Sequence, residues 1–119
     1  MSYKQEIGQD GENIAENYLK KENYQIIERN FRCKQGEIDI IAKDKNEIVF
    51  IEVKTRTNIN YGNPAEAVNT PKQKHIKRAT EYYVHINNLY KYYIRFDVIE
   101  IYYKNKIPQI NHIKQAIEY

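Results

Sequence analysis

The sequence predicts an α/β fold in which a mixed central β-sheet is flanked by helices. Apolar residues recur at helical spacing near the N-terminus, and short Ile- and Val-rich segments follow between residues 24 and 54. A second helical segment then precedes a further apolar strand. Consecutive strands with short turns favour an antiparallel meander, and the later helix allows a parallel crossover. With 119 residues, the chain is expected to form a single domain over 1–119.

The individual elements follow from local signals along the chain. We expect helices over 5–22 and from Thr70 to about Ile86, and strands over 24–31, 37–43, 47–54 and 95–102. Thr70 and Pro71 suit an N-cap and the first helical position. Residues 55–69 are rich in loop-forming residues and are expected to form a long connection. Within 104–119, Pro108 is expected to break any element, and a short terminal helix is the alternative.

Charged residues stand at one end of the central strands. Side chains alternate between the two faces of a strand, so Glu52 and Lys54 are neighbours on one face. Asp39 lies on the preceding strand and is expected to approach them. Charged groups are disfavoured in a small sheet unless they pair or bind something. Carboxylates are ligands for hard cations such as Mg²⁺, so these residues form a candidate metal site, with an ion-pair cluster as the alternative.

Composition sets limits on the cellular setting and the partners. The formal charge of +3 and the isoelectric point near 8.8 permit a polyanionic partner without requiring one. Cys33 is the only cysteine, which excludes an intramolecular disulfide and a cysteine-based zinc site. The N-terminal residues do not form the apolar core of a signal peptide, and no apolar run approaches the roughly 18 residues of a membrane span. We therefore expect a cytoplasmic protein without a membrane segment.

The spacing of these acidic residues resembles a nuclease motif. Asp39, followed thirteen residues later by Glu52-Val53-Lys54, resembles the PD-(D/E)xK motif of restriction-endonuclease-like proteins. Ile38 stands where that motif has proline, which is not a ligand. The wider pattern resembles the bacterial YraN-type family of uncharacterised proteins, related in fold to archaeal Holliday junction resolvases. The matching positions are Gly8, Gly11, Glu12, Ala15, Leu19, Asn30, Arg32, 36–41, 50–56, Gly62, Ala65, Ala67, Val68, Lys72, Lys74 and 95–98.

The resemblance implies a restriction-endonuclease-like fold and assigns roles to particular residues. It implies that Asp39 and Glu52 bind Mg²⁺ or Mn²⁺ and that Lys54 is catalytic. Glu12 matches an additional acidic residue that resolvase-like enzymes place near the metal, so it is a third candidate ligand. Gln73 matches a polar position that completes the site in related nucleases.

Basic residues near this site are candidates for contact with nucleic acid. The candidates for phosphate contact are Arg56, Lys72, Lys74, Lys77 and Arg78. A solvated helix face is the alternative reading for these residues. Arg29 and Arg32 are weaker candidates, and Glu37 is expected to point away from Asp39. The histidines are interpreted as surface or internally satisfied groups, and Asp97 as a partner in a structural salt bridge.

These features favour a divalent-metal-dependent DNA endonuclease, with branched or structured DNA as one substrate class. The first alternative is a non-catalytic DNA-binding or scaffolding protein that retains the nuclease fold. A second alternative is a structural partner protein that uses its Tyr-rich C-terminal half, which we otherwise interpret as packing. Resolvase relatives act as dimers on four-way junctions, and the sequence permits a homodimer without showing an interface.

Overall fold

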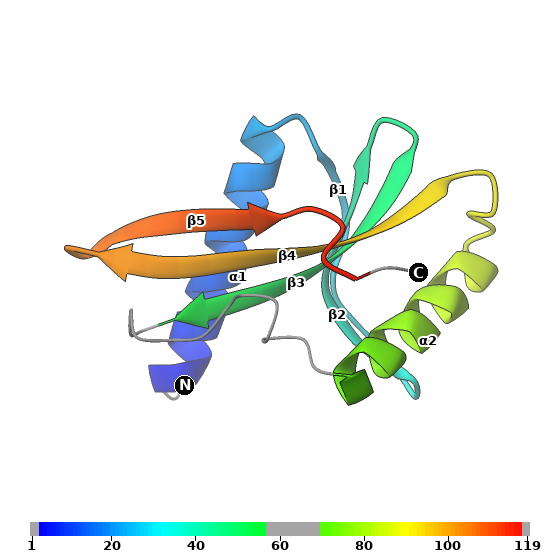
Figure 1. Ribbon diagram of the computed structural model, residues 1–119, viewed down its shortest axis with the longest axis horizontal. Helices are drawn as coiled ribbons and strands as arrows, with labels where there is room; N and C mark the ends of the chain where they lie inside the picture. The colour runs from blue at the N-terminus through cyan, green and yellow to red at the C-terminus, as the bar shows by residue number, and fades with distance from the viewer. Residues whose placement is uncertain (1–2, 57–69, 118–119) are drawn as a thin grey trace.

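The computed structural model describes residues 3–56 and 70–117, with side chains described from Asp10 and from Pro71 onward in these two segments. The elements are α1 (Tyr3–Lys21), β1 (Gln25–Cys33), β2 (Gly36–Asp44), β3 (Glu47–Arg56), α2 (Thr70–Ile86), β4 (Tyr93–Lys104) and β5 (Ile107–Ile113). The strands form one five-stranded sheet in the order β1-β2-β3-β4-β5 (Figure 1). The chain thus places its strands side by side in the order in which they are synthesised.

The sheet is mixed, as the sequence predicts. β1, β2 and β3 form an antiparallel meander, β3 and β4 run parallel, and β4 and β5 are antiparallel. The parallel ladder extends from Glu47 opposite Tyr93 to Arg56 opposite Tyr102. The ladder between β2 and β3 is shorter, because its last pair towards the end of β3 is Ile40 with Ile51. The predicted α/β class is therefore confirmed, and it is compatible with a restriction-endonuclease-like fold.

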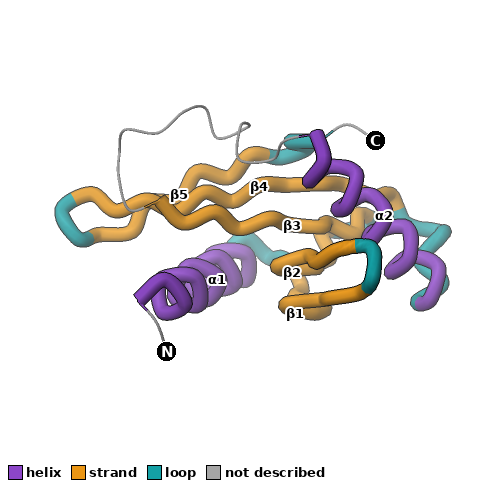
Figure 2. The backbone as a smooth tube through the Cα atoms, turned by 90° about the horizontal axis from the view of Figure 1, so that it is seen from below, coloured by secondary structure: helices purple, strands orange, loops and turns teal. Residues whose placement is uncertain are grey.

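The two helices pack against opposite faces of the sheet (Figure 2). Under α1, the buried cluster consists of Ala15, Leu19, Tyr24, Ile40, Ala42, Val49, Ile51, Ile99 and Ile101. Under α2, it consists of Ile38, Ile41, Ile48, Phe50, Ile76, Ala79, Tyr83, Val84, Phe96, Val98 and Ile117. Because Val49 and Phe50 belong to different clusters, β3 is covered on both sides. Neither helix, over the described residues, has the length and apolar character needed to cross a bilayer.

α1 approaches the sheet closely at Gly11. A Cβ atom at this position would lie 2.1 Å from Thr55 Oγ1 and 3.7 Å from Ile101 Cδ1. A Cβ atom cannot lie as close to another heavy atom as it would to Thr55 Oγ1. Only glycine therefore fits here without a movement of Thr55 or of the helix. Glu12 is the next residue on the helix, so it directly follows the point at which α1 approaches Thr55 of β3.

The C-terminal region differs from the prediction. Residues 107–113 form strand β5 rather than a broken segment or a helix, and Pro108 lies within it opposite Tyr103. An edge strand tolerates proline because one side of it needs no ladder hydrogen bond. The preceding turn has positive φ at Asn105 and Lys106, the combination that closes a tight hairpin. β3 extends through Arg56, and the rest of the predicted 55–69 connection lies outside the described residues.

Candidate active site

Asp39 and Glu52 lie where β2 and β3 separate. The last ladder pair is Ile40 with Ile51, and Asp39 and Glu52 are the next residues beyond it, so the two face each other across the opening. The backbone N–H of Val53 donates a 2.8 Å hydrogen bond to Asp39 Oδ2. A side-chain carboxylate thus replaces the backbone acceptor that a continued ladder would supply, and it fixes the direction of Asp39.

The two carboxyl groups are close enough to affect each other's charge. Burial and the negative charge of Glu52 raise the pKa of Asp39 to about 8, and a hydrogen bond between the two side chains acts in the same direction. The Val53 N–H opposes this shift because it favours the ionised form. A hydrogen bond between two carboxyl groups requires a proton on one of them. The pair therefore resists carrying two negative charges unless a cation lies beside it.

Lys72 supplies a cation to this pair. Its Nζ atom forms an ion pair and hydrogen bond with Glu52 Oε1. The Glu52 side chain is 12% exposed and that of Lys72 is 39% exposed, so the carboxylate is the more buried partner of this ion pair. Lys72 lies in the first turn of α2, and the contact joins that helix to β3. The sequence predicted a phosphate contact for Lys72 and gave no sign of its partner.

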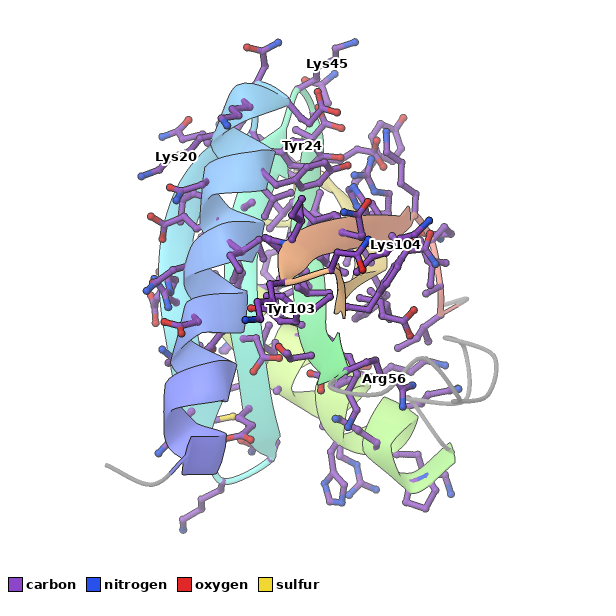
Figure 3. The ribbon with its side chains drawn as sticks, turned by 90° about the vertical axis from the view of Figure 1, so that its left-hand side faces the viewer. Lys20, Tyr24, Lys45, Arg56, Tyr103 and Lys104 are labelled. Atoms are coloured by element: carbon purple, nitrogen blue, oxygen red, sulfur yellow. The ribbon has the colours of Figure 1, made fainter. Side chains whose placement is uncertain are left out.

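Lys54 and Arg56 continue along the same face of β3 as Glu52. Lys54 is half-buried and lies opposite Glu100 of β4 in the parallel register. Arg56, at the end of β3 (Figure 3), donates from Nε to Glu100 Oε2 at 3.2 Å. The Glu100 side chain is 2% exposed, so this is a largely buried ion pair. Arg56 is therefore bound to the sheet, and its predicted contact with nucleic acid stays a prediction.

Glu12 lies within electrostatic range of the pair but does not complete a cluster of three acids. Burial raises the pKa of Glu12, and the charges of Glu37 and Glu52 add to this effect. Arg29 and Arg32 act in the opposite direction. Within residues 3–56 and 70–117, no three His, Cys, Asp or Glu side chains are grouped so that they could hold a metal ion. A ligand role for Glu12 thus requires a movement of its side chain.

The remaining predicted residues lie around this centre. Gln73 follows Lys72 on α2 and is half-buried, and its role stays a prediction. Of the other predicted phosphate contacts, Lys74 and Arg78 are exposed and Lys77 is half-buried, all on α2.

The interpretation of Glu37 was wrong. It lies two residues before Asp39 on β2 and hence on the same face of that strand. Its exposed carboxylate pairs with Arg32 Nε at 3.3 Å. Arg29 likewise contacts Glu16 and Asn13, so neither arginine projects alone into solvent.

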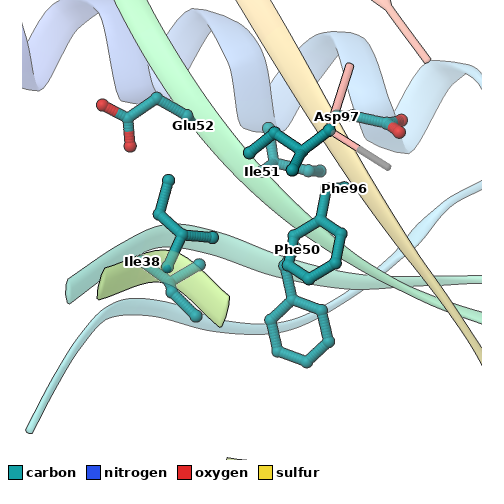
Figure 4. Close-up of a pocket in the computed structure, with 8 residues that line it drawn as sticks. Ile38, Phe50, Ile51, Glu52, Phe96 and Asp97 are labelled. Atoms are coloured by element: carbon teal, nitrogen blue, oxygen red, sulfur yellow. The ribbon is translucent and has the colours of Figure 1, made fainter. Parts of the chain in front are cut away.

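The space between the sheet and α2 beneath Glu52 is tightly packed. An internal cavity of about 10 Å³ is lined by Ile38, Phe50, Ile51, Glu52, Ile76, Phe96, Asp97 and Ile117. A water molecule needs about this volume together with several polar partners, so the cavity cannot admit a ligand. Figure 4 shows the Glu52 carboxylate turned away from the Phe50 ring. A ligand must therefore reach Glu52 from outside this core.

The donor set fits a hard divalent cation. Asp39 and Glu52 present oxygen atoms, and Mg²⁺ is commonly held by one or two carboxylates completed by water and substrate phosphate. The raised pKa of Asp39 beside Glu52 and the ammonium of Lys72 both indicate that the site favours positive charge. The residues present thus suit Mg²⁺ or Mn²⁺, which neither sulfur nor imidazole ligands would favour.

Sequence reasoning missed a second, structural network on the α1 side of β4. Arg95 donates to both oxygens of Asp97 at 3.0 Å, and His112 Nε2 lies 2.6 Å from Asp97 Oδ2. The other ring nitrogen of His112 lies 2.9 Å from the Tyr18 hydroxyl. The salt bridge predicted for Asp97 and the satisfied state predicted for His112 are both confirmed. The extent of the network could not be foreseen, because its members are up to 94 residues apart in the chain.

Comparison with known proteins assigns this chain to a family. The model of an uncharacterised protein family, UPF0102, matches residues 11–101. A UPF0102 protein of Caldicellulosiruptor saccharolyticus is 50% identical over 115 residues, which cover 95% of this chain and 98% of that protein. One of Clostridium kluyveri is 50% identical over 119 residues, or 98% of each chain. One of Clostridium botulinum is 57% identical over 97 residues, 81% of this chain and 79% of that protein. The chain therefore belongs to UPF0102, the YraN-type family that its wider sequence pattern resembles.

Proposed function

We propose that this protein is a divalent-metal-dependent endonuclease that hydrolyses phosphodiester bonds in DNA. The observation that carries the proposal is the carboxylate pair Asp39 and Glu52. Its members face each other at a strand opening, and the pKa of Asp39 rises to about 8 beside Glu52. Two acids that repel each other cost stability, and such pairs occur where a cation binds. A purely structural role would not require the second acid.

The side chains around the pair have complementary tasks in this proposal. Asp39 and Glu52 would hold Mg²⁺ or Mn²⁺ through carboxylate oxygens, and the bound ion would supply Lewis-acid activation of water and phosphate. Lys54, on the same face as Glu52, would stabilise the negative charge that develops on the phosphate during attack. Glu12 would orient water near the pair, because its own carboxyl group lies within range of Glu52.

The exposed cations of α2 provide the binding surface. Lys74 and Arg78 are open to solvent, and Lys77 lies between them in the chain. Lysine and arginine on such a surface bind phosphates without reading sequence, so they position the duplex rather than select it. The proposal includes branched DNA as a substrate and a homodimer as the assembly. Cutting a four-way junction at two equivalent strands requires two active sites, which a homodimer would supply.

A cleavage assay tests the proposal. Linear duplex, single-stranded and four-way-junction DNA are incubated with Mg²⁺ or Mn²⁺ and with wild type, Glu52→Gln or Lys54→Met. We expect cleavage by wild type and a loss of at least a hundredfold in both variants, since each removes a group that acts in the transition state. Glu22→Gln, an exposed change at the end of α1, is the matched control and should cleave as wild type does. Equal cleavage by wild type and Glu52→Gln would reject the site.

A second candidate function is that of a DNA-binding protein without catalytic activity. It is favoured by the described residues, which contain no group of three potential metal ligands, and by the direct contact of Lys72 with Glu52. In this case DNA binding would be equally strong in EDTA and in Mg²⁺, and no metal would support cleavage.

A further inference from the structure

We infer that Lys72 exchanges partners at this site: it neutralises Glu52 when no divalent cation is present, and it contacts a DNA phosphate once the cation takes Glu52. The inference rests on the proposed function, because it concerns the same site. It assigns to Lys72 a role that differs from that of the other cations of α2. Those residues would bind DNA whether or not a metal ion is present.

The ammonium group of Lys72 occupies a position beside Glu52 that a metal ion bound to this carboxylate would need. Its ammonium group touches Glu52 Oε1, one of the two oxygens through which that carboxylate would bind a cation. Glu52 is nearly buried, and a buried carboxylate without a cation partner costs several kcal/mol. The metal-free protein thus needs Lys72 at this position, and metal and ammonium compete for the same oxygen.

The side chain of Lys72 is able to make such an exchange. It is 39% exposed, so part of its stem already borders solvent. Lysine carries a compact charge on a flexible stem of four methylene groups and lacks the rigid fork of arginine. Lys72 also lies in the first turn of the helix that carries Lys74 and Arg78, which are exposed candidates for phosphate contact. An ammonium displaced from Glu52 therefore stays beside the surface on which DNA is expected to lie.

The first test measures Mn²⁺ binding without DNA. Calorimetric titration compares wild type, Lys72→Gln and Lys74→Gln, after thermal unfolding has shown that each variant is folded. Lys72→Gln should bind Mn²⁺ about three- to tenfold more tightly, because the metal no longer competes with the Lys72 ammonium for Glu52. The free energy of such a partly exposed ion pair corresponds to roughly this change in affinity. Lys74→Gln controls for the loss of one positive charge near the site and should change affinity by less than twofold. Lys72→Arg, which keeps the charge, should not tighten binding.

The second test measures whether the DNA contact of Lys72 depends on the cation. Four-way-junction DNA is bound at several salt concentrations, in EDTA and in Ca²⁺, an ion used to occupy the site without turnover. In Ca²⁺, Lys72→Gln should reduce the slope of log affinity against log salt by about one, the effect of one lost phosphate contact. In EDTA, the same variant should leave the slope unchanged. Lys74→Gln should reduce it in both conditions.

The outcomes separate the inference from the proposed function. If wild type cleaves DNA but Lys72→Gln binds Mn²⁺ no more tightly than Lys74→Gln does, the exchange is wrong and the nuclease stands. If Lys72→Gln weakens DNA binding equally in EDTA and Ca²⁺, Lys72 is a permanent phosphate contact and the exchange is again wrong. If neither wild type nor Lys72→Gln binds Mn²⁺, both proposals fail.

Discussion

At the scale of the residue, two opposing influences act on the pKa of Asp39. It accepts a hydrogen bond from the Val53 N–H, which favours the ionised form. It is also half-buried beside Glu52, and burial together with the charge of Glu52 favours the protonated form more strongly. Burial and the charge of Glu52 outweigh the Val53 hydrogen bond, so the pKa of Asp39 rises from its usual value near 3.8 to about 8. A divalent cation bound at the strand opening would instead favour the ionised form of Asp39.

This balance predicts how stability depends on pH. Because the folded-state pKa of Asp39, about 8, exceeds the unfolded value of 3.8, the folded protein binds an extra proton between these pH values. Stability in EDTA should therefore fall as pH rises from about 4 to about 8 and then level off, by on the order of a few kcal/mol. Asp39→Asn, which cannot ionise, should be more stable than wild type at pH 8 and nearly equal at pH 4.

Urea denaturation in EDTA across this pH range provides the measurement for both proteins. The difference between them isolates Asp39 from other titrating groups. A difference that does not change with pH would show that the carboxyl group titrates normally in the folded protein.

At the scale of the element, the position of α1 depends on one residue without a side chain. Gly11 allows the helix to lie against β3 at Thr55, and this approach sets the distance from Glu12 to the site. Glycine within a helix normally costs about 1 kcal/mol relative to alanine. Its presence here indicates that close packing outweighs helix propensity.

Gly11→Ala should consequently destabilise the protein, against the trend for exposed helical glycines. We expect a loss of about 1–3 kcal/mol, because the new methyl group would meet Thr55 Oγ1. Thr55→Ala removes that oxygen, so the double variant should recover most of the loss. Asn17→Ala, an exposed change on the same helix, should instead gain a few tenths of a kcal/mol. Chemical denaturation compares all four proteins, and a stable Gly11→Ala single variant would contradict the packing argument.

Most elements could be predicted from the sequence because their signals are local. The helical spacing of α1, the Pro71 start of α2 and the alternation in β3 each lie within a few residues of chain. β5 was missed because proline was read as a breaker. The hairpin before β5 has Asn105 and Lys106 at its turn, without the glycine that makes this turn type easy to recognise. Pairing with β4 decides the structure of 107–113, and pairing is not a local property.

At the scale of the whole molecule, one charge network joins segments from both halves of the chain. Arg95 of β4 contacts Asp97, the Tyr24 hydroxyl at 2.6 Å, and the carboxylates of Asp44 and Glu47. Asp97 further accepts the backbone N–H of Gln115 at 3.1 Å, beyond β5. Hydrogen bonds from His112 and Arg95 hold the pKa of Asp97 below its usual value, although burial alone would raise it. The network therefore joins β4 to the β2–β3 hairpin and to the residues that follow β5.

Removing the centre of this network should destabilise the whole protein. Arg95→Met leaves buried Asp97 without its cation, a change that typically costs about 3–5 kcal/mol. Lys104→Met at the exposed end of β4 is the control and should change stability by less than about 0.5 kcal/mol. Urea denaturation at pH 7 measures both variants. Equal midpoints for Arg95→Met and wild type would show that the network has no net effect on stability.

Part of the candidate site could be predicted from the sequence, because the signals for that part are local, as they are for the helices and strands. Asp39, Glu52 and Lys54 lie on one hairpin, so alternation along the strands shows which of them share a face. Lys72 comes from a helix that follows 13 undescribed residues, 57–69, and no local pattern predicts its contact with Glu52. Glu12 depends on how closely α1 packs at Gly11, which a sequence pattern cannot measure.

The hairpin of β2 and β3 has a consequence for biosynthesis. Asp39 and Glu52 lie on two consecutive strands, so closing one short loop is enough to bring them together. Lys72 emerges only afterwards, on α2. A hairpin formed before α2 docks would carry two acids without the lysine that neutralises Glu52. Docking of α2 against the sheet contributes to both the hydrophobic core and the charge balance.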